Sequence, residues 1–149
     1  MSRRSVEFSV AIDAPVDRVW SLMIDFDDYP RWNPFVVQAR APEGVAIGAP
    51  LHLRVRFPNG MRGRPRERIT ELRPPDSGGA LLAYRFVGMP AAILRVERRQ
   101  ELTPLDSGRC RYTTREFFTG ALRHLVPLGQ IEEGTRWQAD ALKWAAEAP

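Results

Sequence analysis

The sequence predicts an α+β fold, in which about six to seven antiparallel strands form a curved sheet wrapped around a long C-terminal helix. Residues 5–12 alternate apolar and polar side chains, as in a strand with one buried face. Pro15 and the apolar residues after it indicate a helix, and several strand-like segments follow. Residues 131–147 carry apolar side chains at spacings of three and four, which is typical of an amphipathic helix.

Two short helices are expected directly after the first strand. The first begins near Pro15, with Asp13 as its N-cap, and runs to about residue 24. A second helical turn covers residues 25–29. Pro30 and Pro34 are expected to end helical structure and to force extended backbone before them. These helices would close one end of the sheet.

Turn-forming Gly, Pro and Asn residues separate the remaining predicted strands. The strands cover residues 35–40, 51–57, 64–72, 81–87, 93–102 and 109–118. Residues 74–79 close the third of these strands, and residues 104–108 form the turn of a long hairpin. Residues 121–148 are expected to be helical after an irregular start at 127–129. We see no linker or repeat, so residues 1–149 are expected to form one domain.

Composition narrows the function classes. The chain has 149 residues, of which 44% are hydrophobic and 27% charged, as in an ordinary soluble protein. No apolar run approaches the roughly 20 residues that span a bilayer, and no signal peptide is recognised, so we expect a cytoplasmic protein. Cys110 is the only cysteine, and the two histidines are His52 and His124. We therefore expect no disulfide, no metal centre and no cofactor.

The charge is basic but not obviously organised. The net charge is +4, and of the 22 basic residues only Lys143 is a lysine. The arginines are spread over nearly every segment, which indicates a compositional bias rather than a nucleic-acid-binding stripe. We expect no nucleic-acid partner, and a monomer or homodimer.

Several motifs together resemble one superfamily. They are Ile12-x-Ala14-Pro15-x-x-x-Val19-Trp20, Asp25-x-x-x-Tyr29-Pro30-x-Trp32-Asn33-Pro34-Phe35, Ile69-Thr70-Glu71-Leu72-x-Pro74-Pro75, Glu116-x-Phe118-x-Gly120 and Ala141-Leu142-Lys143. They resemble the START-like helix-grip (SRPBCC) superfamily, and most closely its polyketide cyclase/dehydrase branch. The resemblance implies a helix-grip fold with an elongated, mainly apolar pocket between sheet and helix. It does not select a reaction, because the superfamily includes cyclases, aromatases, dehydrases, lipid carriers and ligand sensors.

Alternation predicts which polar side chains point into such a pocket. Glu116 shares a face with Phe118 on the last strand, and Arg98 and Gln100 lie on the more apolar face of its neighbour. Glu67 shares a face with Ile69. Buried charges must pair or lie near water. Arg98 and Glu116 therefore form either the polar end of a ligand pocket or, as the favoured alternative, an internal ion pair that fixes the strands.

Other candidates carry two interpretations each. Trp32 either stacks on a ligand at the pocket mouth or, as favoured, anchors the core. Gln138 either bonds to a ligand or lies at a wet end of the cavity. Asn33 is expected in a turn, His52 on the outer face, and His124 near the entrance as the one histidine placed to act as a general base. Trp137 and Trp144 are expected to cover a sheet edge, and the loops with Met61 and Met89 are either gates or ordinary turns.

The predicted ligand-binding residues are Trp32, Phe35, Leu53, Val55, Ile69, Tyr84, Arg98, Gln100, Tyr112, Thr114, Glu116, Phe118, Gln138 and Leu142. The first functional hypothesis is binding of a hydrophobic small molecule, such as a lipid, a polyketide or a quinone-like ring, in a cavity of several hundred cubic ångströms. The alternative is a polyketide cyclase, aromatase or dehydrase, with Glu116 as base and Arg98 polarising a carbonyl. A third is a module that binds a protein or ribosome through an Arg-rich outer face. Whether the protein is an enzyme stays open.

Overall fold

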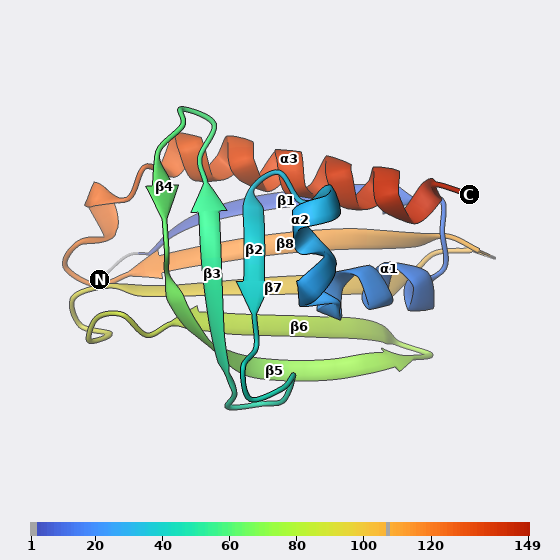
Figure 1. The fold of residues 1–149 in the computed structure, drawn as a ribbon, viewed down its shortest axis with the longest axis horizontal. Helices are drawn as coiled ribbons and strands as arrows, with labels where there is room; N and C mark the ends of the chain where they lie inside the picture. The colour runs from blue at the N-terminus through green and yellow to red at the C-terminus, as the bar shows by residue number, and fades with distance from the viewer. Residues whose placement is uncertain (1–2, 107) are drawn as a thin grey trace.

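The computed structural model describes residues 3–106 and 108–149. A curled antiparallel sheet wraps around one long helix, so the predicted helix-grip fold is confirmed (Figure 1). The elements are β1 (Arg4–Ile12), α1 (Val16–Ile24), the 3-10 turn η1 (Phe26–Asp28), α2 (Tyr29–Trp32), β2 (Val36–Arg40), β3 (Pro50–Arg56), β4 (Arg62–Gly63), β5 (Arg66–Asp76), β6 (Gly79–Phe86), β7 (Arg95–Pro104), β8 (Cys110–Thr119), the 3-10 turn η2 (Arg123–Leu125) and α3 (Leu128–Glu147). Ser107, which belongs to the predicted hairpin turn, and residues 1–2 lie outside the described residues.

The sheet has the strand order β1-β8-β7-β6-β5-β3-β2, and the short β4 pairs with β3. Its pairings are antiparallel. Figure 1 shows β2, β3 and β4 crossing in front of the other strands, while α3 runs along the top of the molecule. The inner face of β2, β3 and β4 and the inner face of the other strands therefore both border the space beside α3 (Figure 1).

Helix α1 begins as expected after Pro15, but its predicted cap is wrong. Pro15 itself is the N-cap residue, in extended backbone, and no side chain in the described part of the chain caps the helix. Asp13 instead uses its backbone N–H, which donates to Glu147 Oε2 at 2.8 Å and ties β1 to the end of α3. Val19, Trp20 and Met23 are buried on one side of the helix, as their spacing predicts.

The prediction that Pro30 ends helical structure is also wrong. Tyr29 has helical backbone angles, φ −55° and ψ −39°, and Pro30 lies in the first turn of α2. A proline is tolerated there because the first turn of a helix has no carbonyl to pair with its missing N–H. Before Pro34 the expectation is met, since Asn33 is extended.

Strand β5 is longer than expected and continues through Pro74 and Pro75 to Asp76. Of the described residues of β5, only 66–68 pair with β3, so the far half of β5 pairs with β6 alone. The ladder also shifts register between Arg73 and Asp76. Prolines are compatible with an open edge and with a bulge, and the chain therefore turns only at Ser77–Gly78.

Helix α1 fills one half of the space between sheet and α3. It packs against β5, β6 and β7, and against α3. Large side chains complete the packing there, including fully buried Leu82, Leu102, Tyr112 and Leu142. A second, smaller hydrophobic cluster of Val6, Phe118 and Ile131 lies toward the other end of α3.

The predicted position of Trp144 at a sheet edge is wrong. Trp144 is 81% exposed and Trp137 is 39% exposed, so Trp144 does not cover a sheet edge. Among the described residues, no helix has the length and apolar character needed to cross a bilayer.

Candidate functional site

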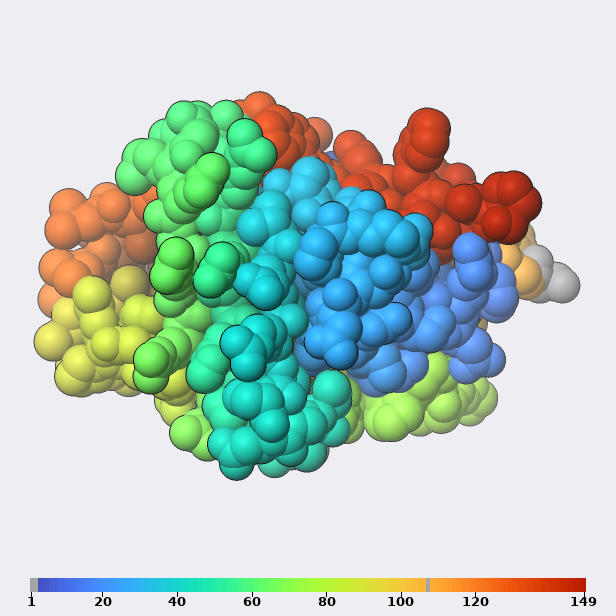
Figure 2. Space-filling view, viewed as in Figure 1, coloured from blue at the N-terminus to red at the C-terminus, as the bar shows by residue number. Residues whose placement is uncertain are grey.

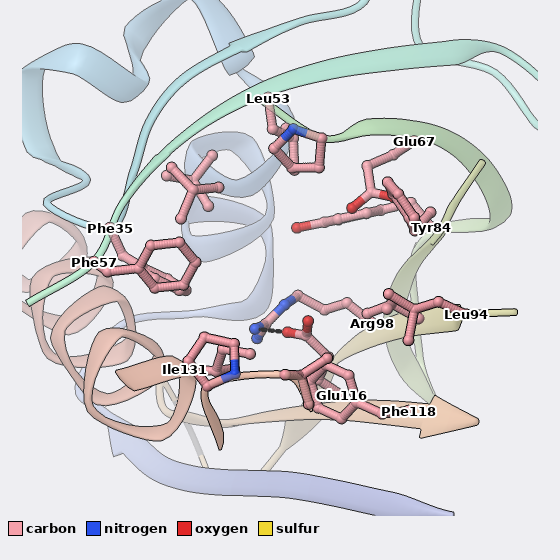
Figure 3. Close-up of a pocket in the computed structure, with 17 residues that line it drawn as sticks. Phe35, Leu53, Phe57, Glu67, Tyr84, Leu94, Arg98, Glu116, Phe118 and Ile131 are labelled. Carbon is pink, nitrogen blue, oxygen red and sulfur yellow. Dashed lines mark hydrogen bonds and ion pairs between the residues drawn. The ribbon is translucent and has the colours of Figure 1, made fainter. Parts of the chain in front are cut away.

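A cavity of about 230 Å³ lies between the N-terminal part of α3 and the inner face of the sheet (Figure 3). Its lining residues are Phe35, Val36, Leu53, Val55, Phe57, Pro65, Glu67, Tyr84, Phe86, Leu94, Val96, Arg98, Glu116, Phe118, Val126, Pro127 and Ile131. Most of these side chains are apolar, and only Glu67, Arg98 and Glu116 carry ionisable acid or guanidinium groups. The volume is smaller than expected, because α1 and its neighbours fill the other half of the interior.

Three connections border the cavity at one end of the molecule. Figure 2 shows them together, as the green β3–β4 hairpin, the yellow segment before β7 and the orange segment before α3. The backbone N–H of Asn59 donates to Gln130 Oε1 at 2.8 Å, which ties the hairpin to α3. Two backbone bonds, Ala121 N–H to Ala92 and Leu122 N–H to Ile93, join the other two segments. Met61 and Met89 are exposed in these loops and lie outside the cavity lining that the described residues form.

The wall opposite the polar groups depends on close approach of α3 to β2. Phe35 packs edge-on against Phe57, with ring centroids 5.8 Å apart. A Cβ added to Gly134 of α3 would collide with the Phe35 ring. The absence of a side chain at Gly134 therefore leaves room for Phe35 beside the helix.

Arg98, which is 5% exposed, makes several polar contacts at the cavity wall. Arg98 on β7 lies directly opposite Glu116 on β8 and forms an ion pair with it. Its other guanidinium contacts are Thr114 Oγ1 at 2.7 Å and Thr135 Oγ1 of α3 at 3.1 Å. Burial tends to lower the pKa of Arg98, but Glu116, Tyr84 and Tyr112 outweigh it and leave the pKa raised. The charged Arg98 side chain therefore links β7 to β8 and to α3.

Glu67 and Tyr84 face the same cavity, and neither side chain forms a hydrogen bond or ion pair with another described residue. Glu67 is 8% exposed, and its Oε2 has no hydrogen-bond partner among the described residues. Burial, and then the charge of Glu116, raise its pKa to about 9 despite the opposing effect of Arg98. Burial also raises the pKa of Tyr84. Figure 3 shows the Glu67 carboxyl and the Tyr84 hydroxyl pointing inward from the side opposite Phe35 and Phe57.

Half of the predicted ligand-binding residues line the cavity. These are Phe35, Leu53, Val55, Tyr84, Arg98, Glu116 and Phe118. The predicted inward direction of Arg98, Glu116 and Glu67 is confirmed by their burial and by this lining. The ligand-pocket and ion-pair interpretations of Arg98 and Glu116 are compatible, because the pair both joins the strands and borders the cavity.

The other seven predicted residues lie outside the lining that the described residues form. They are Trp32, Ile69, Gln100, Tyr112, Thr114, Gln138 and Leu142. Trp32 packs edge-on against Tyr29 at 5.2 Å, as the core-anchor interpretation requires. The Tyr112 hydroxyl donates to Gln100 Oε1 at 2.5 Å within the filled half of the interior. Thr114 contacts Arg98 rather than the cavity. Gln138 is 2% exposed, and its Oε1 has no hydrogen-bond partner among the described residues.

Some lining residues outside the predicted set could have been found from sequence patterns, and others could not. Leu94 and Val96 share the inward face with Arg98, so the alternation of the strand already indicated their direction. Ile131 is the first residue of the amphipathic pattern of residues 131–147. Val126 and Pro127 lie in an irregular connection, where no periodic signal exists.

The remaining polar residues considered as candidates lie outside the cavity lining that the described residues form. Asn33 Oδ1 accepts bonds from the backbone N–H groups of Phe35 and Val36, at 3.0 and 2.9 Å, so it fixes the predicted turn. His52 is exposed on the outer face as expected. His124 is exposed in η2 and outside the lining of the cavity, and Cys110 is a buried free thiol whose pKa is raised by burial.

The outer face of β2, β3, β4 and the start of β5 carries a cluster of exposed arginines that we call the arginine face. Its members are Arg40, Arg54, Arg56, Arg62, Arg64 and Arg66. Arg56 lies directly opposite Arg62. On the far strands, by contrast, Arg115 pairs with Glu7 at 3.0 Å and Arg99 pairs with Glu71. The expectation of a dispersed basic charge is therefore wrong, because the fold brings separate segments together. Binding of a protein or ribosome through this face stays a prediction.

Comparison with known proteins gives the same fold and a family. Residues 3–147 match the model of the family described as polyketide cyclase/dehydrase and lipid transport. The chain belongs to this family. The family match covers nearly the whole chain, and the resemblance drawn from the sequence motifs is confirmed.

Three solved structures of similar fold illustrate the comparison. An aromatase/cyclase from Streptomyces sp. R1128 is 18% identical with a TM-score of 0.79, over 98% of this chain and 94% of that one. A START superfamily protein from Mycobacterium smegmatis is 19% identical with a TM-score of 0.71, over 96% and 97%. Norcoclaurine synthase from Thalictrum flavum, solved with dopamine and hydroxybenzaldehyde, is 11% identical with a TM-score of 0.66, over 97% and 86%. At these identities the likeness concerns the fold.

Proposed function

We propose that the protein binds a small, largely apolar molecule in the cavity beside α3. The observation that carries the proposal is the cavity itself, which has apolar walls and a few polar groups at one side. The family's description, and the small aromatic molecules held by the norcoclaurine synthase relative, support a guest of this kind.

The volume limits the size of the guest. An apolar cavity of about 150 Å³ accepts benzene. A cavity of about 230 Å³ therefore suits a molecule of roughly two fused rings. Removal of its apolar surface from water supplies the affinity, at about 25 cal/mol per Å² before the costs of ordering.

Titration calorimetry with 2-ethylnaphthalene tests this proposal. We expect saturable one-to-one binding to the wild type. Val96→Phe places a ring in the cavity and should weaken binding at least tenfold while the protein stays folded by circular dichroism. Val45→Phe, the same exchange in an exposed loop, should bind like the wild type. Absence of binding by the wild type, or equal binding by Val96→Phe, would refute the proposal.

A second candidate function is cyclisation of a short poly-β-ketone. The supporting observation is that Arg98, Glu116 and Glu67 face one cavity, so a proton acceptor and groups that polarise a carbonyl lie together. Glu116 would take a proton from a carbon between two carbonyls, and the resulting carbanion would attack another carbonyl of the chain, whose oxygen then takes up a proton. Arg98 would stabilise the oxygen on which charge develops. Equal conversion of a poly-β-ketone mimic by wild type and Glu116→Gln would exclude this role for Glu116.

A further inference from the structure

The cavity has no unbalanced positive charge for an anionic guest. Among the described residues its charged lining consists of Arg98, Glu116 and Glu67. Arg98 is already paired with Glu116 and bonded to Thr114 and Thr135. A carboxylate entering the cavity would lose its hydration and lie near Glu116 without a free cation, which costs several kcal/mol.

Glu67 is the acid of the cavity whose Oε2 lacks a hydrogen-bond partner among the described residues. Glu67 is 8% exposed, and its carboxyl points into the cavity (Figure 3). The groups that face it are Arg98 on β7, Glu116 on β8 and Tyr84 on β6. Burial and Glu116 hold its pKa near 9, so the carboxyl keeps its proton at neutral pH.

A protonated carboxyl offers one O–H donor. In an apolar cavity, a donor without a partner costs free energy that an acceptor on the guest recovers. We infer that Glu67 donates a hydrogen bond to the guest and selects uncharged molecules that carry an acceptor oxygen, such as ring ketones or aldehydes, over hydrocarbons and carboxylates. This inference rests on the proposed function, because it requires that a guest enters the cavity.

Three probes with the same ring system test the inference by calorimetry at pH 7. They are 2-acetylnaphthalene, which has an acceptor, 2-ethylnaphthalene, which has none, and 2-naphthoate, which is an anion. One added hydrogen bond predicts a roughly 3- to 10-fold preference of the wild type for the acetyl over the ethyl compound. The naphthoate should bind more weakly than either.

Two variants assign the preference to Glu67. Glu67→Leu should bind the ethyl compound at least as well as the wild type and lose the preference for the acetyl compound. Glu67→Gln, whose amide also donates, should keep it. In the wild type the preference should fall as the pH rises through about 9, and it should not fall in Glu67→Gln, because none of the probes titrates there.

A spectroscopic readout separates a hydrogen bond from altered packing. The carbonyl stretch of carbon-13-labelled acetylnaphthalene should lie at lower frequency in the wild type than in Glu67→Leu. An unchanged acetyl-to-ethyl ratio in Glu67→Leu, or naphthoate binding as tight as acetylnaphthalene binding, would overturn the inference while leaving the proposed function standing. If the ethyl compound does not bind at all, the proposed function fails and the inference fails with it.

Discussion

At the scale of single residues, Arg98 and Glu116 form a unit. Their charges are almost entirely enclosed, with side-chain exposures of 6% and 13%. Enclosed charges are costly to desolvate, and the pair is favourable only while both partners are present. Removing one partner is therefore a different experiment from removing both.

Arg98→Met leaves Glu116 as an uncompensated charge inside the protein. We expect the free energy of unfolding to fall by about 3–5 kcal/mol. The double variant Arg98→Met/Glu116→Leu removes both charges and should recover most of that loss. Urea unfolding of the wild type and both variants measures the difference. A double variant as unstable as the single one would show that the contacts to Thr114 and Thr135, rather than the charge pair, dominate.

Glu67 makes stability depend on pH. Below about pH 4.3, the usual pKa of glutamate, the folded and unfolded chains both hold the proton. Between that value and about 9 only the folded protein holds it, so the free energy of unfolding falls as the pH rises, by at most about 1.4 kcal/mol per unit from this group. Glutamine does not titrate, so Glu67→Gln should not lose stability in this way as the pH rises. Its stability relative to the wild type should increase from pH 5 to pH 8 in urea unfolding, and parallel curves would contradict the raised pKa.

At the scale of elements, the contact of α3 with Phe35 shapes the cavity wall. Replacing glycine by alanine inside a helix normally stabilises it by up to about 1 kcal/mol. At Gly134 the added methyl group collides with the Phe35 ring, which must then shift toward the cavity. Gly129 lies on the same helix with open space around it.

Gly134→Ala should therefore destabilise the protein by about 1–3 kcal/mol through overpacking, and it should weaken binding of 2-ethylnaphthalene. Gly129→Ala is the matched control and should leave stability equal or slightly higher, with unchanged binding. Thermal unfolding and calorimetry of the two variants provide the test. Equal effects of the two substitutions would show that Phe35 does not depend on the gap at Gly134.

The elements also show where sequence patterns stop being informative. Alternation predicted correctly that Arg98, Gln100, Tyr112 and Glu116 point inward. It could not tell which of them border open space, because that depends on where α1 packs along the sheet. The prolines were misread for a similar reason: Pro30 fits a first helical turn and Pro74 an open strand edge, and both depend on neighbouring structure.

At the scale of the whole molecule, charge is unevenly distributed. Arginines on β7 and β8 pair with glutamates, whereas the arginine face holds like charges side by side. Each segment contributes only one or two of these arginines, so the cluster is visible only after the strands are paired. Like charges directly opposite each other in a sheet destabilise it.

Arg62→Glu places an acid opposite Arg56 and should stabilise the protein by about 0.2–1 kcal/mol. The gain should shrink in high salt, because exposed charges are screened. Arg115→Glu is the matched control, since Arg115 already pairs with Glu7 and its reversal should destabilise. Thermal unfolding at low and high salt measures both. A loss of stability in Arg62→Glu would mean that the arginines of this face do not repel one another.

The central claim is that a guest occupies the space beside α3. A crystal structure of the protein with 2-acetylnaphthalene tests it most directly. We predict density for the naphthalene ring between Phe35, Ile131 and Tyr84, with the carbonyl oxygen about 2.5–3.0 Å from the Glu67 carboxyl. A structure in which the probe binds only on the surface, or in which side chains fill the cavity, would contradict the account.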